Sequence, residues 1–163
     1  MAVVFATMSD ASPPPDHVVA TAREALTGWL AALADNPVVD EVVEDVEADV
    51  ERWFVRVLGD AKDVYSVWFT FRQRTLAYET YVMPAPEENE TQFYEMLLRR
   101  NDRLPLVHFS IGDEQAIFLK GRSDLDQVDD ELLDRVLGAF YEAVELCFVP
   151  ALRVGFATRF DNR

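Results

Sequence analysis

The side chains best suited to acid–base, nucleophilic or metal chemistry are few in this chain of 163 residues. His17 and His108 are its only histidines and Cys147 is its only cysteine, and none has a partner at a recurring metal-ligand spacing. Cys147 stands in an apolar run without an adjacent cation that would lower the pKa of the thiol. We expect a packed thiol, an exposed His17 at a helix start and a half-buried His108 in a strand, with no metal site and no catalytic residue.

Motifs for phosphate binding and acyl transfer do not occur either. The six glycines form no GxGxxG, GxxxxGKS/T or GxSxG pattern, so the backbone requirement of phosphate cradles and nucleophile elbows is not met. Paired acids could perform acid–base chemistry only if they converged in a cleft. Glu87-Glu88 and Asp129-Asp130 fall at predicted helix starts, where negative charge is favourable, and Glu44-Asp45 falls in an acidic connection. We predict no enzyme and no cofactor.

One cationic cluster and one tryptophan are the candidate partner-binding residues. Arg99, Arg100, Asn101 and Arg103 lie close together, and their guanidinium groups could pair with a carboxylate or another anion on a partner. Compensation of charge at a helix C-terminus is the more ordinary role of such a cluster. Trp68 belongs to an aromatic-rich segment that could form a binding surface, although such segments more often pack in a core.

The charge balance excludes some classes of partner. Thirty acidic against 15 basic side chains give a formal net charge of -15, which repels nucleic acid and anionic membranes. The acidity otherwise indicates a solvated surface. The apolar start, Met1 to Met8, is short and has no basic region before it, so neither secretion nor membrane insertion is predicted. With one cysteine, a reducing cytoplasm is the expected location.

Apolar spacing predicts an amphipathic helix at the start of the domain. Residues recur at i, i+3 and i+4 after Asp16, which we expect to be the N-cap, and Asn36-Pro37 should end the helix. The stretch from Val38 to Glu51 that follows is strongly acidic and contains spaced valines. It is predicted to be either a short edge strand or a charged connection.

The middle of the chain predicts an antiparallel meander. Three segments rich in aromatic and β-branched residues are separated by short polar turns. These segments are Arg52 to Leu58, Val64 to Phe71 and Thr75 to Met83. In the second segment Tyr65, Val67, Phe69 and Phe71 form one row, so one face should meet helices and the other is only partly apolar.

The second half predicts a helix, a hairpin and a long helix. Glu87, Glu88 and Glu90 should lead a helix that ends near Arg100. A hairpin is expected from Leu106 to Ile111 and from Gln115 to Lys120, and then a long helix capped by Asp129 with a kink or break at Pro150. The predicted fold is α+β: helix, three-stranded antiparallel meander, helix, two-stranded hairpin, long C-terminal helix. Residues 16–163 form one domain after a flexible N-terminal arm, residues 1–15.

Four segments resemble the YbjN-domain proteins of actinobacteria. They are Arg72–Leu76, Tyr78–Asn89, Leu97–Asn101 and Ala151–Ala157, within a match over roughly residues 17–160. The resemblance implies a fold similar to type III secretion chaperones, with the same order of elements as predicted above. It also implies a dimer-forming, protein-binding domain described as a sensory-transduction regulator. The acidic stretch 40–51 and the N-terminal arm have no place in the shared core, and no role is predicted for them.

Three functions follow, in this order. The first is a non-enzymatic, chaperone-like or regulatory homodimer in the cytoplasm that binds an unidentified protein or peptide through a sheet edge or an apolar surface. The second is a regulator that senses a small molecule or signal through a pocket on the aromatic sheet. The third is an enzyme that uses the cluster Arg99 to Arg103 with Glu87 or Glu88 and His108.

Overall fold

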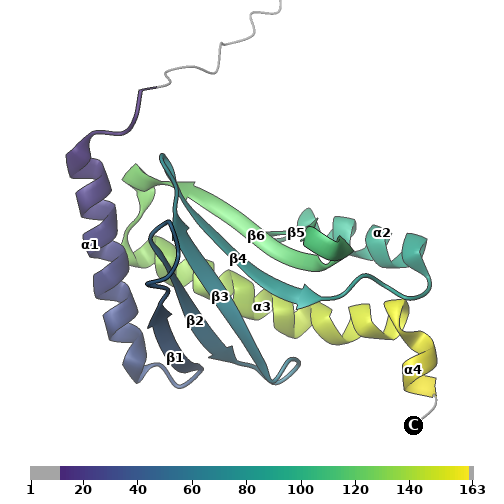
Figure 1. Ribbon diagram of the computed structural model, residues 1–163. Helices are drawn as coiled ribbons and strands as arrows, with labels where there is room; N and C mark the ends of the chain where they lie inside the picture. Colours follow the sequence, from purple (N-terminus) through teal and green to yellow (C-terminus); the bar gives the residue numbers. More distant parts are fainter. Residues whose placement is uncertain (1–11, 162–163) are drawn as a thin grey trace, which may run out of the picture.

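The computed structural model describes residues 12–161 as one antiparallel sheet with helices packed against it (Figure 1). The predicted arm therefore lies mostly outside the described residues. The helices are α1 (Asp16–Ala32), α2 (Glu90–Asn101), α3 (Asp130–Gly155) and α4 (Ala157–Asp161), with short 3-10 turns η1 (Leu33–Asp35), η2 (Asp113–Gln115) and η3 (Leu125–Gln127). The strands are β1 (Val39–Glu44), β2 (Arg52–Leu58), β3 (Val64–Phe71), β4 (Thr75–Met83), β5 (His108–Ile111) and β6 (Ile117–Asp124).

The meander and the hairpin are joined into a single six-stranded sheet of order β1-β2-β3-β4-β6-β5. The junction is β4 with β6, which pair antiparallel from Thr75 opposite Asp124 to Met83 opposite Ile117. Of the two alternatives for the acidic stretch, residues 39–44 are an edge strand and the following residues form a loop to β2. The mixed α+β fold and its element order are confirmed.

The inner face of the sheet holds the core, because α1 and α3 cover it (Figure 1). The predicted inner row of β3 is buried, with Val67 and Phe69 fully inaccessible. Aromatic rings connect the layers edge to face. Trp29 of α1 lies 5.5 Å from Phe69, and Phe140 of α3 lies 5.9 Å from Tyr78 of β4, both between ring centroids. Burial of such rings contributes most of the energy that holds helices on a sheet.

α1 differs from the prediction at its start, and α3 differs from it at Pro150. Pro15, not Asp16, is the N-cap of α1, and Asp16 is its first helical residue. In α3 the predicted cap is confirmed, since the Asp129 carboxylate accepts a hydrogen bond from the Leu132 N–H at 2.8 Å. Pro150 does not break α3, which continues to Gly155. Pro150 lies on the exposed side, so the carbonyl that loses its partner can face water.

Glu87 and Glu88 bind the C-terminal segment, so placing them at the start of a helix was wrong. Their backbone N–H groups donate to the Gly155 carbonyl at 2.9 and 3.1 Å, which ends α3. The Glu88 carboxylate accepts from the backbone N–H and the hydroxyl of Thr158, and Glu87 pairs with Arg159. These contacts tie the connection between β4 and α2 to α4.

The turn between β2 and β3 is held from two sides. The Glu145 carboxylate of α3 accepts from the N–H groups of Asp60 and Ala61, each at 3.0 Å. Lys62 Nζ donates to the carbonyls of Tyr81 and Val82 at 3.0 and 2.8 Å. Burial lowers the pKa of Lys62 to about 8. The ammonium is therefore stabilised by two carbonyls but loses part of its hydration.

Two glycine substitutions should change stability in opposite directions. A Cβ on Gly121 would lie 2.2 Å from the Leu106 carbonyl oxygen and 2.3 Å from the Tyr78 ring, whereas a Cβ on Gly138 would meet nothing within 4 Å. We expect Gly121→Ala to lower the free energy of unfolding by about 1–3 kcal/mol. Gly138→Ala, in the interior of α3, should raise it by roughly 0.5–1 kcal/mol. Urea unfolding measures both, and equal effects would contradict the packing around Gly121.

Lys62 should make stability depend on pH. An unfolded lysine titrates near about 10.4, so between pH 8 and that value the unfolded chain binds more protons at this side chain than the folded chain. Stability therefore rises with pH in this window. We expect the native protein to gain stability relative to Lys62→Met and Lys62→Arg between about pH 7 and pH 9.5, because neither replacement titrates there. Thermal melts across this range test the effect, and parallel curves for all three proteins would refute it.

Candidate functional site

The outer face of the sheet is left open by the helices, which lie on the other side (Figure 1). Side chains alternate along each strand, so the residues between the buried ones point outward and are partly exposed. Four aromatic residues belong to this face: Phe54, Trp68, Tyr81 and Phe118. Tyr81 is 45% exposed. We call this surface the outer aromatic face.

Phe54 and Trp68 form the first half of the outer aromatic face. They are opposite one another on β2 and β3, and their ring centroids are 4.9 Å apart. The guanidinium of Arg52 lies over the Trp68 ring at 3.9 Å from its centroid, a distance suited to a cation–π contact. Arg52 Nε also lies 3.4 Å from the Asp45 carboxylate. Trp68 is therefore held in place while one side remains partly exposed.

Tyr81 and Phe118 form the second half, on β4 and β6. Their ring centroids are 5.7 Å apart in an edge-to-face arrangement. Lys62 Nζ lies 5.1 Å from the Tyr81 ring and Lys120 Nζ lies 4.9 Å from the Phe118 ring. Burial, and then the nearby Glu114 carboxylate, raise the pKa of Tyr81, so its hydroxyl stays protonated at neutral pH. Each aromatic pair therefore has an arginine or lysine side chain stacked on at least one of its rings, although the protein as a whole is acidic.

Ion pairs neutralise most charge on this face. Lys120 Nζ lies 3.6 Å from the Glu79 carboxylate, and Arg56 lies 3.3 Å from Asp40 and 3.0 Å from Glu41. All these side chains are partly exposed, so the pairs contribute little stability and mainly fix side-chain positions. The outer aromatic face is consequently apolar at its aromatic pairs and nearly balanced in charge around them.

His108 was predicted to be half-buried, but it is exposed. It lies opposite Lys120 on β5, an edge strand, so it points to the outer side. Glu87 and Glu88 bind α4 instead of a cleft, and the Arg99 to Arg103 cluster lies at the end of α2. The carboxylates of the enzyme hypothesis are therefore engaged by α4, while the cationic cluster adjoins the strand of His108. His17 is exposed and Cys147 is buried, as predicted.

The five predicted partner-binding residues lie in two separate places. Trp68 is on β3, while the cationic cluster lies at the C-terminal end of α2 beside β5, with β4 and β6 between these strands in the sheet. Arg99 pairs with Glu95 one helical turn earlier, at 2.7 Å. Arg100 and Arg103 contribute to an open hollow of about 720 Å³. The hollow is lined by Gln92, Glu95, Met96, Arg99, Arg100, Asp102 and Arg103.

Asn101 is engaged with the backbone of the edge strand. Its carboxamide oxygen accepts from the Phe109 N–H at 2.6 Å, and its amide nitrogen donates to the Phe109 carbonyl at 3.2 Å. This pair of bonds is what a neighbouring strand would supply. The structure thus gives Asn101 a structural role at the end of α2.

An apolar groove beside Asn101 was not predicted. It has a volume of about 290 Å³ and lies between α2 and β5, lined by Tyr94, Leu97, Leu98, Asn101, Phe109, Ser110, Ile111 and Ile117. Leu98 is 69% exposed and Ile111 is 51% exposed at this groove. The adjacent leucines 97 and 98 are a usable signal, because two successive helical residues cannot both face one core.

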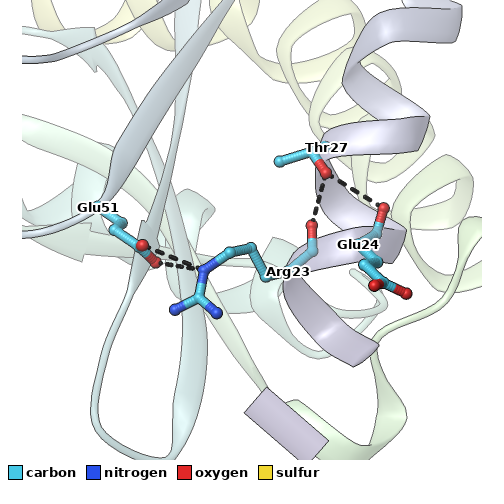
Figure 2. A network of polar contacts seen from close by, with 4 residues as sticks. All are labelled: Arg23, Glu24, Thr27 and Glu51. Atoms are coloured by element: carbon cyan, nitrogen blue, oxygen red, sulfur yellow. Dashed lines mark hydrogen bonds and ion pairs between the residues drawn. The ribbon is translucent and has the colours of Figure 1, made fainter. Parts of the chain in front are cut away.

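The acidic loop between β1 and β2 is fastened to α1. Figure 2 shows Arg23 of α1 reaching Glu51, with Nε 3.1 and 3.0 Å from the two carboxylate oxygens. Backbone contact adds to this, since the Phe71 N–H donates to the Glu51 carbonyl at 2.9 Å. In the loop before Glu51, Val46 is 81% exposed and Val50 is 40% exposed. The loop therefore presents apolar and acidic side chains together.

Residues 12–161 contain neither a metal-binding cluster nor a helix able to cross a membrane. This part of the chain contains no cluster of three or more histidine, cysteine or carboxylate side chains that could hold a metal ion. Within it, no helix combines the length and apolarity needed to cross a bilayer. The surfaces described above can bind through aromatic stacking, apolar contact, ion pairing and backbone hydrogen bonds.

Curated relatives with similar sequences come from mycobacteria. An uncharacterized protein of Mycobacterium leprae is 34% identical over 105 residues, covering 64% of this chain and 57% of that protein. Uncharacterized proteins of Mycobacterium tuberculosis and Mycobacterium bovis are 33% identical over 102 residues, covering 63% of this chain and 56% of each relative. The chain thus spans little more than half the length of these relatives.

The type of fold is shown by a similar solved structure, and the family is shown by a matching family model. A chain of the heterodimeric complex ExoU–SpcU, from the type III secretion system of Pseudomonas aeruginosa, has a similar fold with a TM-score of 0.55. The identity is 16%, and the match covers 76% of this chain and 94% of that one. Residues 22–152 match the YbjN family model, described as "Putative bacterial sensory transduction regulator". The chain therefore belongs to the YbjN family and has a type III secretion chaperone-like fold.

Proposed function

We propose that this chain is a non-enzymatic regulatory domain that binds a protein partner on its outer aromatic face and acts as a cytoplasmic homodimer. The observation that carries the proposal is the open sheet face with four partly exposed aromatic side chains. A sheet face that contacts only solvent does not need aromatic side chains of this kind.

Aromatic side chains held by cations suit recognition of a polypeptide. Trp68 and Tyr81 offer large contact areas, and the cations stacked on them limit the conformational entropy that would be lost on binding. The description of the family as a regulator supports a binding role. The similar solved chain is part of a heterodimeric complex, which supports a protein partner.

The cationic cluster is proposed as a second contact for the same partner. Arg100 and Arg103 line the hollow at the end of α2 and have no ion pair to a described residue, whereas Arg99 is paired with Glu95. A carboxylate on the partner would form ion pairs with these two arginines. Asn101 contributes by fixing α2 against β5, which sets the position of these arginines.

The homodimer is proposed to form through the groove between α2 and β5. Leu98 and Ile111 are exposed there beside buried apolar residues, and a second copy would remove both from water. The Asn101 carboxamide already hydrogen-bonds the backbone N–H and C=O groups of Phe109. The two copies would therefore pack through side chains rather than by extending the sheet.

Substitution of an exposed leucine should separate the dimer. We expect Leu98→Asp to convert a dimer to a monomer, measured by light scattering over a range of concentrations, because it places a charge in the apolar contact. Leu146→Asp is the matched control, since Leu146 is 51% exposed on α3, away from the groove. This variant should remain a dimer. A native protein with a concentration-independent monomer mass would refute the dimer.

Photocrosslinking at Trp68 tests the binding face. The photoreactive residue benzoylphenylalanine at position 68 should crosslink a defined polypeptide in the native cell, and at Phe160, which is 42% exposed on α4, it should not. Additional replacement of Phe54 by Asp should abolish the crosslink while circular dichroism stays native. The sensor alternative would be favoured if no polypeptide is crosslinked and a metabolite raises the melting temperature.

A further inference from the structure

The two edges of the sheet are not equivalent, because only one is closed by a side chain. On β5 the Gly112 N–H bonds the Ala116 carbonyl, so the alternate residues Phe109 and Ile111 direct their N–H and C=O groups away from β6. The Asn101 carboxamide takes both groups of Phe109. An incoming strand would have to displace this contact.

The backbone groups of the β1 edge are open. The Asp45 N–H donates to the Arg52 carbonyl at 2.9 Å, so Val43 and Glu41 face β2 with their backbone groups, and Val42 and Glu44 direct theirs outward. No described residue hydrogen-bonds these outward N–H and C=O groups. They are free to pair with another extended segment.

A groove runs along this open edge. It has a volume of about 420 Å³ and lies between β1 and the end of α1, lined by Leu30, Ala31, Ala34, Val39, Asp40, Glu41 and Val42. Its walls are apolar on the α1 side, and its rim carries carboxylates. A strand paired with β1 would turn alternate side chains toward these two environments.

The charge around the β1 edge determines which kind of polypeptide segment can pair with it. Residues 40–51 contain seven carboxylates. Of the arginines in the described part of the chain, three pair with them, from α1 and β2. Glu44, beside the outward backbone groups, has no ion pair to any described residue. A second β1 strand would bring like charges together, whereas basic side chains would be attracted.

We infer that β1 accepts an extended polypeptide segment with alternating basic and apolar side chains, added as a seventh strand in the groove beside α1. The inference rests on the proposed function, of which it names a second contact and the chemistry of the partner. Backbone pairing supplies the alignment, apolar residues pack toward Leu30 and Ala34, and basic residues face the acidic rim. Acidic edge strands elsewhere serve to prevent pairing, so the test must separate pairing from repulsion.

A short synthetic peptide of alternating lysine and valine, capped at both ends, is the probe. We expect it to bind the full chain and to shift the backbone amide resonances of Val42 and Glu44 in NMR spectra. The same peptide with N-methyl groups on alternate residues keeps its charge but loses one hydrogen-bonding edge. It should bind at least about tenfold more weakly. A glutamate–valine peptide should not bind.

A pair of charge variants locates the site. Glu41→Lys, at the rim of the groove, should weaken binding of the lysine–valine peptide by about tenfold, and Glu142→Lys, which makes the same charge change at an exposed position of α3, should leave it within about twofold. Both variants alter exposed side chains, so both should fold, and circular dichroism checks this.

Three results would overturn the inference: no binding of the lysine–valine peptide, equal binding of its N-methylated form, or shifts confined to residues outside β1. The second result would reduce the effect to non-specific attraction between charges. Failure here leaves the crosslink at Trp68 untouched, and failure of that crosslink leaves the peptide measurement valid, so the two proposals can fail separately.

Discussion

The alternation of side chains across the sheet is the constraint on which every surface depends. Because α1 and α3 bury one face, most of the alternate residues of the central strands that face them are apolar, and their neighbours point outward. A shift of one residue in the register of β3 would bury Trp68 and expose Phe69. The core therefore determines which aromatic residues are available at the surface, and the outer aromatic face exists only while the inner one is correctly packed.

The acidic composition is arranged rather than spread uniformly. Among the cationic side chains on the strands, Arg52, Arg56 and Lys120 are paired with carboxylates or stacked on rings, while the cationic cluster at the end of α2 and the acidic edge at β1 lie at opposite ends of the strand order. Although the net charge is -15, the cationic cluster would attract anionic groups and the acidic β1 edge would attract cationic groups. Such a distribution favours partners that are themselves patterned, since a uniformly charged surface would meet repulsion at one end.

Local patterns were sufficient for the elements, and tertiary contacts decided the rest. Periodicity predicted α1, the strands β2 to β4 and α3, because each has a regular apolar row. The pairing of β4 with β6 joins segments distant in the chain, and no local pattern indicates it. Glu87 and Glu88 were misplaced for the same reason, as their partners Arg159 and Thr158 lie 72 and 70 residues away. In the candidate site, Trp68 was identified from composition, but the uncovered side of its sheet could be recognised only once the helices were placed.

The hydrogen bonds between Asn101 and Phe109 make the two edges of the sheet unequal for the addition of a further strand. A molecule with two free edges can be extended at both and can propagate into a fibre, as each added strand creates a new template. Here one edge is terminated internally, by a side chain from the adjacent helix. If β1 accepts an added strand as proposed, the Asn101 contact at Phe109 would oppose the same addition at β5, so that backbone pairing would end with one added strand.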